Sequence, residues 1–295
     1  MAIGSKLKQL SRVASDPRWW RFRLQRRVME PDEREWRAHN IALKRRVSTG
    51  ADAGRQPSGE LAENGLHLLG SILSPEKCDE ARNFLSNRRV MDPYRPRNSF
   101  LPLGEGRDSA SHVGYHVAKD IVDCPHLVEL ANRPELLRIA EAFLGCQPTI
   151  SYMAAWWSYP TPLAAQQAEL FHRDVDDWRF LKLFVYLTDT SADNGAHVYV
   201  KRSPHSRELL EIRRFSDDEV AATFGKNAIT ALPGRAGEGF LENTFGLHRG
   251  LPLRSGVRLM FQAVYSLHPL PYGPRRPVAE RPSGLDPYVN KVYFK

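Results

Sequence analysis

The chain has 295 residues, of which 42% are hydrophobic and 26% are charged, and its formal net charge is +8. This mixture is that of an ordinary globular protein, and the length suits one large domain or a domain with appendages. The three cysteines have no CxxC spacing, which argues against a thiolate zinc site and a disulfide framework and favours a reducing cytoplasm. The sequence contains no apolar run of about 18 residues, so no transmembrane helix is predicted.

Residues 1–60 are rich in lysine and arginine and predict a basic helical extension. Helices are expected over 6–29 and 31–48, because Pro31 suits a first helical position and an acidic first turn is followed by a basic end. Glycine, serine and proline make 49–60 a linker. The start of the chain lacks a continuous apolar segment, so it predicts neither a signal peptide nor a lipid anchor.

The aromatic residues of this extension leave two interpretations open. Trp19, Trp20 and Phe22 lie among arginines, a mixture that suits an anionic membrane surface or nucleic acid. The preferred interpretation is a solvated arm whose aromatic side chains pack on the domain, because isolated charge runs are usually only surface. We therefore expect no nucleic-acid partner, and peripheral membrane contact is the alternative.

The main domain is assigned to 61–295 and ends in a proline-rich tail. A short strand is predicted over 64–73, a helix over about 74–89, loops over 92–125 and a second helix over 133–145. Short β-branched or aromatic segments separated by turn residues then predict strands in PTISYMAAWWSYP, AELFHRDVDDW, FLKLFVYLTD, AHVYVKR, AITALP, EGFLEN and RLMFQAVYS.

One predicted helix interrupts these strands, and the order of the elements indicates the fold class. Ser216 and Glu219 form a capping box, and Gly225 ends the helix. Helices followed by a series of short strands, with no βαβ alternation, predict a mainly β protein with flanking helices, built as an antiparallel sandwich or barrel. A double-sheet jelly roll is preferred, and it offers a mouth between the sheets where strand side chains converge.

A His-x-Asp pair lies in one of the predicted strands. His172 and Asp174 are two residues apart, so a strand directs both side chains to the same face. His248 lies in a distant segment before another strand and supplies a second imidazole. Two histidines and one carboxylate, with open positions opposite, form the facial triad that holds non-haem Fe(II) in oxygenases. The combination favours iron ligation over a structural role.

Residues near this triad are candidates for a co-substrate site. Arg258 opens the apolar run after His248, and its guanidinium suits a dicarboxylate through two parallel hydrogen bonds. Gln262 follows on the same strand face, where a buried structural hydrogen bond is the alternative. Lys182 reaches a carboxylate if its strand face is the inner one, and a solvated strand end is the alternative.

Aromatic and acidic residues beside the same strands are candidates for substrate binding. Trp156, Trp157 and Trp178 flank the segments that carry the triad, and aromatic walls suit a ligand pocket. Ordinary core packing is the alternative for these tryptophans. Asp176 continues the same-face series that begins at His172, which places it toward the mouth of the pocket.

Two segments of the chain resemble a known family. FHRDVDDWRFLKLFVYLTDTSADNGAHVYVKRSPHS and HRGLPLRSGVRLMFQAVYS are similar to the phytanoyl-CoA dioxygenase family of Fe(II)- and 2-oxoglutarate-dependent oxygenases, and the likeness spans about half of the chain. The family pattern of H-x-D, a second His and a following Arg is matched by His172, Asp174, His248 and Arg258. The segment 203–205 departs from the family, because Ser-Pro-His replaces the usual Gly-Ser-His.

The resemblance implies a double-stranded β-helix, the jelly-roll core also found in cupins. It implies Fe(II) held by the triad, 2-oxoglutarate held by Arg258, and O2 as the oxidant. The implied reaction hydroxylates an unactivated C–H bond of a small molecule and releases succinate and CO2. Related halogenases have a small residue at the carboxylate position, so Asp174 favours hydroxylation or a variant such as desaturation. The substrate and the oligomeric state are left open.

Two other functions are kept as alternatives. A non-catalytic relative would use the pocket as a ligand sensor or partner platform, and the intact triad argues against this. A peripheral membrane or nucleic-acid-binding protein would act through the basic arm. We interpret the chain as a cytoplasmic oxygenase, and we expect it to keep its 2-oxoglutarate site without residues 1–60.

Overall fold

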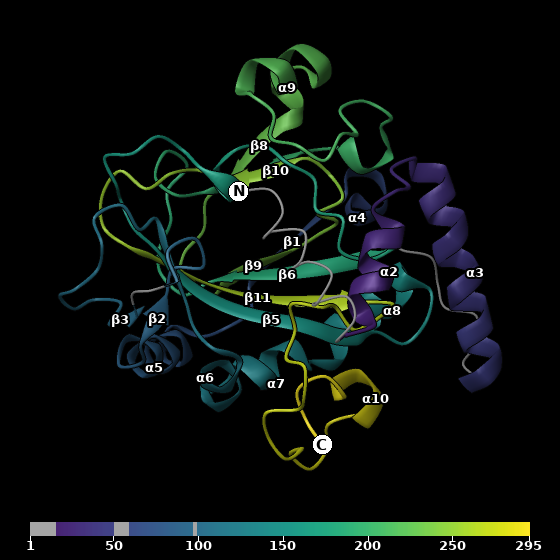
Figure 1. Cartoon of the computed structure of the whole chain (residues 1–295), viewed down its shortest axis with the longest axis horizontal. Helices are drawn as coiled ribbons and strands as arrows, with labels where there is room; N and C mark the ends of the chain where they lie inside the picture. Colours follow the sequence, from purple (N-terminus) through teal and green to yellow (C-terminus); the bar gives the residue numbers. More distant parts are fainter. Residues whose placement is uncertain (1–15, 50–58, 97–98) are drawn as a thin grey trace, which may run out of the picture.

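The computed structural model describes residues 16–49, 59–96 and 99–295 (Figure 1). In the predicted extension, this part contains the helices α2 (Arg18–Gln25) and α3 (Pro31–Thr49). The start of the predicted first helix and most of the predicted linker lie outside the described residues. Among the described helices, none combines the length and the apolar character that crossing a bilayer requires.

The first described helix is shorter than the sequence predicts. α2 begins only at Arg18, whose backbone amide donates to the carboxylate of Asp16 at 3.0 Å. Pro17 stands between them, at a position where its missing amide hydrogen costs nothing. Asp16 and Pro17 thus mark the point at which this helix begins.

Short helices and strands follow along the rest of the described chain. The helices are α4 (Glu60–Asn64), α5 (Pro75–Ser86), α6 (Ala118–Asp123), α7 (Leu127–Ala131), α8 (Pro134–Leu144), α9 (Asp217–Phe224) and α10 (Pro287–Asn290). The strands are β1 (Leu66–Ser71), β2 (Val90–Met91), β3 (Ser99–Phe100), β4 (Val113–Tyr115), β5 (Thr149–Ser158), β6 (Phe180–Tyr186), β7 (His197–Val200), β8 (Ile229–Leu232), β9 (Glu238–Glu242), β10 (His248–Gly250) and β11 (Arg258–Ser266).

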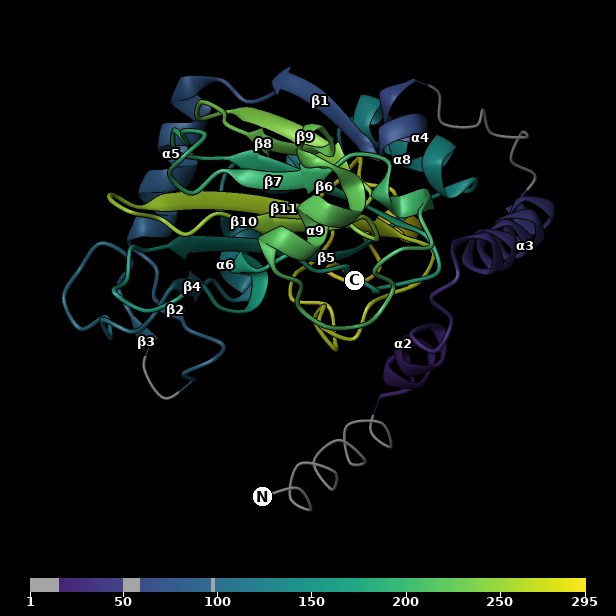
Figure 2. The same ribbon diagram turned by 90° about the horizontal axis from the view of Figure 1, so that it is seen from above.

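The strands form two antiparallel sheets. The large sheet has the order β1-β9-β6-β11-β5-β4-β2-β3, and the small sheet has the order β10-β7-β8. In Figure 1 the small sheet and α9 lie above the large sheet, whereas α5, α6, α7 and α10 lie below it. Figure 2, seen from above, shows the small sheet in front of the large one. This arrangement confirms the predicted jelly roll with flanking helices.

Alternation along the central strands separates the apolar core from a cavity. Leu181, Leu183 and Val185 of β6 face the helices and are buried in one large apolar cluster. The intervening Lys182 and Phe184 line a cavity between the two sheets. Successive residues of a strand point to opposite faces, so the strands that build the core also carry the cavity wall.

The predicted strand in AELFHRDVDDW is only partly formed. His172 makes an isolated antiparallel bridge to His248 at the edge of the small sheet, and Phe171 makes another to Phe215 outside the named strands. Residues 173–179, here named the ligand loop, have no regular strand pairing. Three aspartates disfavour a strand here, because their carboxylates compete for backbone donors. The Asp177 carboxylate does so by accepting from the next amide at 2.9 Å.

The central strand β11 offers a test of this core. Phe261 is 0% exposed in the apolar cluster on the helix side of the large sheet. Phe261→Ala leaves a void that its neighbours fill only in part, so it should lower the free energy of unfolding by about 3–5 kcal/mol in chemical denaturation. The control Leu163→Ala truncates a 49% exposed side chain and should change it by less than about 0.5 kcal/mol. Equal losses would contradict the assigned core.

Candidate metal centre

His172, Asp174 and His248 converge on one point. One ligand atom of each lies within 4.8 Å of the other two. The Nε2 atom of His248 is 3.2 Å from Oδ2 of Asp174, and the Nε2 atom of His172 is 3.6 Å from Oδ1. An isolated antiparallel bridge between the two histidines brings their ring centroids to 4.3 Å. The H-x-D spacing therefore predicted the convergence, although the loop that carries Asp174 is irregular.

Backbone carbonyls fix the orientation of both imidazoles. The Nδ1 atom of His172 lies 2.9 Å from the Leu170 carbonyl, and that of His248 lies 3.0 Å from the Gly246 carbonyl. A carbonyl only accepts, so each Nδ1 carries the proton and each Nε2 keeps a lone pair. Both lone pairs belong to the nitrogens nearest Asp174. Two neutral imidazoles and one carboxylate are the donor set that a divalent transition metal takes, so these residues fit an iron ion.

The charges of the triad are set by burial and by neighbouring groups. Burial opposes ionisation of Asp174, but Lys182 and His248 outweigh it and hold the pKa of the carboxyl well below its usual range. Burial, aided by His248, lowers the pKa of His172 to about 3. Burial also opposes protonation of His248, yet the Asp174 carboxylate raises its pKa above the ordinary value. A metal ion therefore competes with a proton mainly at His248.

Lys182 contacts the ligand carboxylate itself. Its Nζ atom lies 2.6 Å from Oδ2 of Asp174 and 2.9 Å from Oδ2 of Asp176. Burial favours the neutral amine, but the two carboxylates raise the pKa of Lys182 above its ordinary value, so it stays a cation. The side chain faces inward, as one of the two sequence interpretations has it. Its partners are protein carboxylates, so its direct role is to neutralise and orient them.

Arg258 lines the same cavity and holds a buried guanidinium that forms no ion pair with any described acidic residue. Its Nη2 atom donates to the Ser158 hydroxyl at 2.8 Å, and its Nη1 atom donates to the Gly195 carbonyl. Its Nε atom has no partner within the described chain. A buried cation without a counter-charge is costly, so this position suits an anionic ligand. The fork of the guanidinium matches a carboxylate.

The remaining predicted residues divide between cavity and core. Trp156, Gln262 and Asp176 line the cavity. Trp157 is fully buried on the opposite face of β5, and its indole donates to His116 at 3.1 Å. The prediction that Trp157 contacts a substrate is therefore wrong, because it follows Trp156 directly in a strand and must point the other way.

Trp178 also lies outside the lining of this cavity. It belongs to the apolar core, and the guanidinium groups of Arg34 and Arg37 lie 5.6 Å and 4.9 Å from its ring centroid. Trp178, also predicted to contact the substrate, lines a separate cavity with Arg34 and Phe245. Its position is set by the irregular path of the ligand loop, which the sequence pattern does not determine.

A buried His–Glu pair beside the triad is absent from the sequence predictions. The His197 ring lines the cavity and stacks on His248 with centroids 5.6 Å apart. Its Nε2 atom lies 2.8 Å from the fully buried Glu242 carboxylate. The register between β9 and β6 pairs Glu242 with Lys182. Directly paired residues share a face of the sheet, so this register indicates that Glu242 lies on the same face as Lys182.

The cavity has a volume of about 520 Å³, and aromatic side chains form part of its wall. Tyr115 stacks on Trp156 with centroids 5.5 Å apart, and Tyr152 meets Tyr272 edge to face at 5.8 Å. The tyrosines come from separate short strands and loops, so no local sequence pattern marks them as neighbours. The volume is that of a site for a small organic molecule.

Several solved structures resemble this architecture at low sequence identity. The apoform of EctD from S. alaskensis has a TM-score of 0.51 at 18% identity, over 72% of this chain and 80% of that chain. HygX from Streptomyces hygroscopicus, with nickel and 2-oxoglutarate bound, has a TM-score of 0.50 at 15% identity, over 70% and 84% of the two chains. The non-heme alpha ketoglutarate dependent carbocyclase SnoK from nogalamycin biosynthesis has a TM-score of 0.48 at 19% identity, over 70% and 81%.

The sequence itself matches no family model and no curated protein. At these identities the comparison establishes the fold alone: the chain has the jelly roll of these solved structures, which is the fold that the sequence resemblance implies.

The triad predicts stoichiometric metal binding. Titration with Co(II), followed by calorimetry, should show one site whose affinity is strongly reduced in His172→Ala and in His248→Ala, because each removes one of three protein ligands. His39→Ala, on the exposed side of α3, is the control and should bind as the unchanged protein does. The affinity should fall as the pH is lowered, because the raised pKa of His248 keeps a competing proton on that ligand. Undiminished binding by both histidine variants would contradict the assignment.

Proposed function

We propose that the chain is an Fe(II)- and 2-oxoglutarate-dependent dioxygenase that hydroxylates an unactivated C–H bond of a small-molecule metabolite and releases succinate and CO2. One observation carries the proposal. A single cavity contains both a two-histidine, one-carboxylate triad and a buried arginine without an acidic partner among the described residues. The first suits iron, and the second suits the far carboxylate of 2-oxoglutarate.

The residues of the cavity have distinct roles in this proposal. His172, Asp174 and His248 hold Fe(II), and Arg258 with the Ser158 hydroxyl holds the distal carboxylate of 2-oxoglutarate. When bound, the metal, 2-oxoglutarate and O2 supply the oxidation chemistry. The protein supplies position and charge. It keeps both imidazoles in the metal-binding tautomer and neutralises the ligand carboxylate.

The substrate in this proposal lies against the aromatic wall. Trp156 and Tyr115 form a stacked pair that suits a flat apolar face of a ligand. Asp176 lines the same cavity and supplies a polar contact. The Lys182 ammonium lies 2.9 Å from this carboxylate, and the Tyr272 hydroxyl donates to it at 2.6 Å. The substrate class is thus a small molecule with both an apolar face and a hydrogen-bonding group.

Asp174 supports hydroxylation over halogenation, because the third protein ligand is a carboxylate and no coordination position is left for a halide. Desaturation uses the same site and is the alternative outcome. A purely ligand-binding role is disfavoured, because all three metal ligands are present and correctly oriented.

The three cysteines are buried free thiols, which supports a reducing, cytoplasmic location.

The co-substrate site is tested by Arg258→Met. Loss of a charge-assisted hydrogen-bonded pair should weaken 2-oxoglutarate binding to the Co(II)-loaded protein by about tenfold to a hundredfold in calorimetry. Arg254→Met, an exposed arginine on the same segment, is the matched control and should leave the affinity unchanged. Fe(II)-dependent succinate formation in air should fall in Arg258→Met and persist in the control.

Two results would defeat the proposed function. The first is a protein that binds 2-oxoglutarate equally with and without metal. The second is a metal-loaded protein that neither binds 2-oxoglutarate nor forms succinate from it.

A further inference from the structure

The ligand loop has outward-facing backbone groups that the sheets do not satisfy. Asp174 and Asp176 point into the cavity, and the Asp174 amide donates to the Thr244 carbonyl at 2.8 Å. The loop has no regular strand partner, so the carbonyls of Val175 and Asp177 need donors from elsewhere. A buried carbonyl without a donor is costly, and such groups nearly always find one.

The N-terminal arm, meaning the described residues 16–49 with α2 and α3, supplies these donors. Gln25 is fully buried at the end of α2, and its Nε2 atom donates to the Val175 carbonyl at 2.5 Å. Arg34 of α3 is also buried, and its Nη2 atom donates to the Asp177 carbonyl. Arg26 adds a longer hydrogen bond to the Val175 carbonyl at 3.4 Å, so three side chains of the arm supply donors that a neighbouring strand would otherwise provide.

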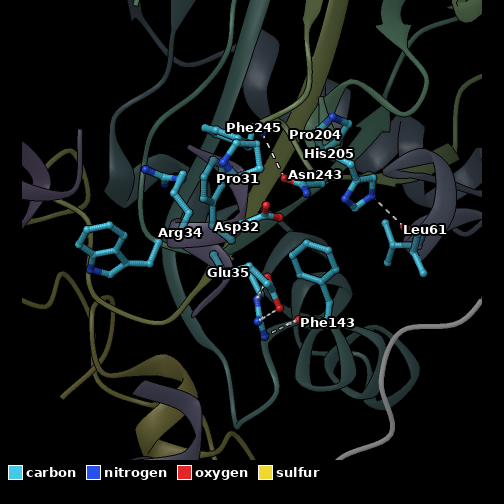
Figure 3. Close-up of a pocket in the computed structure, with 14 residues that line it drawn as sticks. Pro31, Asp32, Arg34, Glu35, Leu61, Phe143, Pro204, His205, Asn243 and Phe245 are labelled. Carbon is cyan, nitrogen blue, oxygen red and sulfur yellow. Dashed lines mark hydrogen bonds and ion pairs between the residues drawn. The ribbon is translucent and has the colours of Figure 1, made fainter. Parts of the chain in front are cut away.

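Arg34 also joins the two helices of the arm to each other. Its guanidinium donates to the backbone carbonyls of Gln25 at 3.0 Å and Val28 at 2.8 Å, and to the side chain of Gln25 at 3.0 Å. It lies 4.6 Å from the ring centroid of Phe245, and both residues line a second cavity beside α3 (Figure 3). Burial lowers the pKa of Arg34 to about 10, which leaves it charged at neutral pH. Its hydrogen bonds go to carbonyls, the groups that the loop and α2 present.

A third contact reaches the metal ligands through side chains. Trp19 and Phe22 of α2 pack edge to face on Tyr272, with centroids 6.4 Å and 5.4 Å away. The Tyr272 hydroxyl donates to Asp176, which pairs with Lys182, and that ammonium holds Asp174. The arm therefore contacts the ligand loop at its backbone and supports the residues that orient its carboxylates.

A fourth contact fixes the end of the ligand loop. The Glu35 carboxylate of α3 pairs with Arg179, whose Nε atom lies 3.1 Å from it. The same guanidinium donates to the Leu144 carbonyl at 2.9 Å, at the end of α8. The arm thus contacts alternate residues of the loop, at positions 175, 177 and 179. The side chains of Asp174 and Asp176, which lie between them, face the cavity.

We propose that the N-terminal arm is an integral part of the metal centre, with Gln25 and Arg34 as positioning residues for Asp174. The proposal rests on the proposed metal-dependent function. It replaces the expectation that the site persists without residues 1–60. The donors on the arm hold the loop in the position where the Asp174 carboxylate meets the two imidazoles. Removing these hydrogen bonds should therefore lower metal affinity while the protein still folds.

The test measures Co(II) affinity, the visible spectrum of bound Co(II), and thermal unfolding of the metal-free protein, all in the full-length chain. Gln25→Ala and Arg34→Met should each weaken Co(II) binding by about tenfold, as loss of groups that orient metal ligands typically does. They should also alter the Co(II) spectrum, which reports the geometry of the ligands. Arg34→Lys keeps the charge and one donor, and it should recover part of the affinity.

Lys44→Met is the matched control, because Lys44 is exposed on the same helix as Arg34. It should leave Co(II) affinity and spectrum unchanged. Folded Gln25→Ala protein with unaltered affinity and spectrum would overturn the proposal, and this variant decides the question if Arg34→Met does not fold. Failure of the unchanged protein to bind Co(II) would overturn the proposed function instead, so the two failures are distinguishable.

Discussion

The Asp174 carboxylate is the group on which the rest of the structure depends. Its side chain is 23% exposed, and a negative charge so largely removed from water needs compensating positive charge or strong donors. Here Lys182 lies 2.6 Å away, and two imidazoles close the other side. Strand β6 supplies this lysine on its inner face, and the ligand loop brings the carboxylate to it. The metal-binding geometry arises where this pair meets the two histidines that an antiparallel bridge holds together.

Strand alternation makes this arrangement compatible with a stable fold. The apolar side chains of β5, β6 and β11 pack toward the helices, and the polar and aromatic side chains between them line the cavity. Polar groups needed for chemistry thus sit one residue away from the residues that stabilise the protein. The same rule explains why Trp156 lines the cavity while Trp157 belongs to the core.

Features with a local cause were predictable from sequence, whereas those that depend on the path of a loop were not. The jelly roll follows from short-range periodicity, and the H-x-D spacing keeps His172 and Asp174 close together even though Asp174 lies on the irregular ligand loop. The contact of Lys182 with the ligand carboxylate does not, because the strand pattern predicts the face of the sheet on which a side chain lies and not the group that it contacts. Trp178 and the donors of the N-terminal arm belong to the same class. Trp178 lies on the ligand loop, and the donors of the arm have their partners there. This loop has no regular pairing, so its course is fixed only by tertiary contacts.

The central claim is that two imidazoles and one carboxylate of this chain bind a single ferrous ion. X-ray absorption at the iron edge of the Fe(II)-loaded protein tests it most directly, because imidazole rings give a distinctive multiple-scattering pattern. The structure predicts two imidazoles and oxygen donors around iron, with one imidazole lost in His248→Ala. An iron spectrum with no imidazole contribution, or one unchanged by that substitution, would contradict the account.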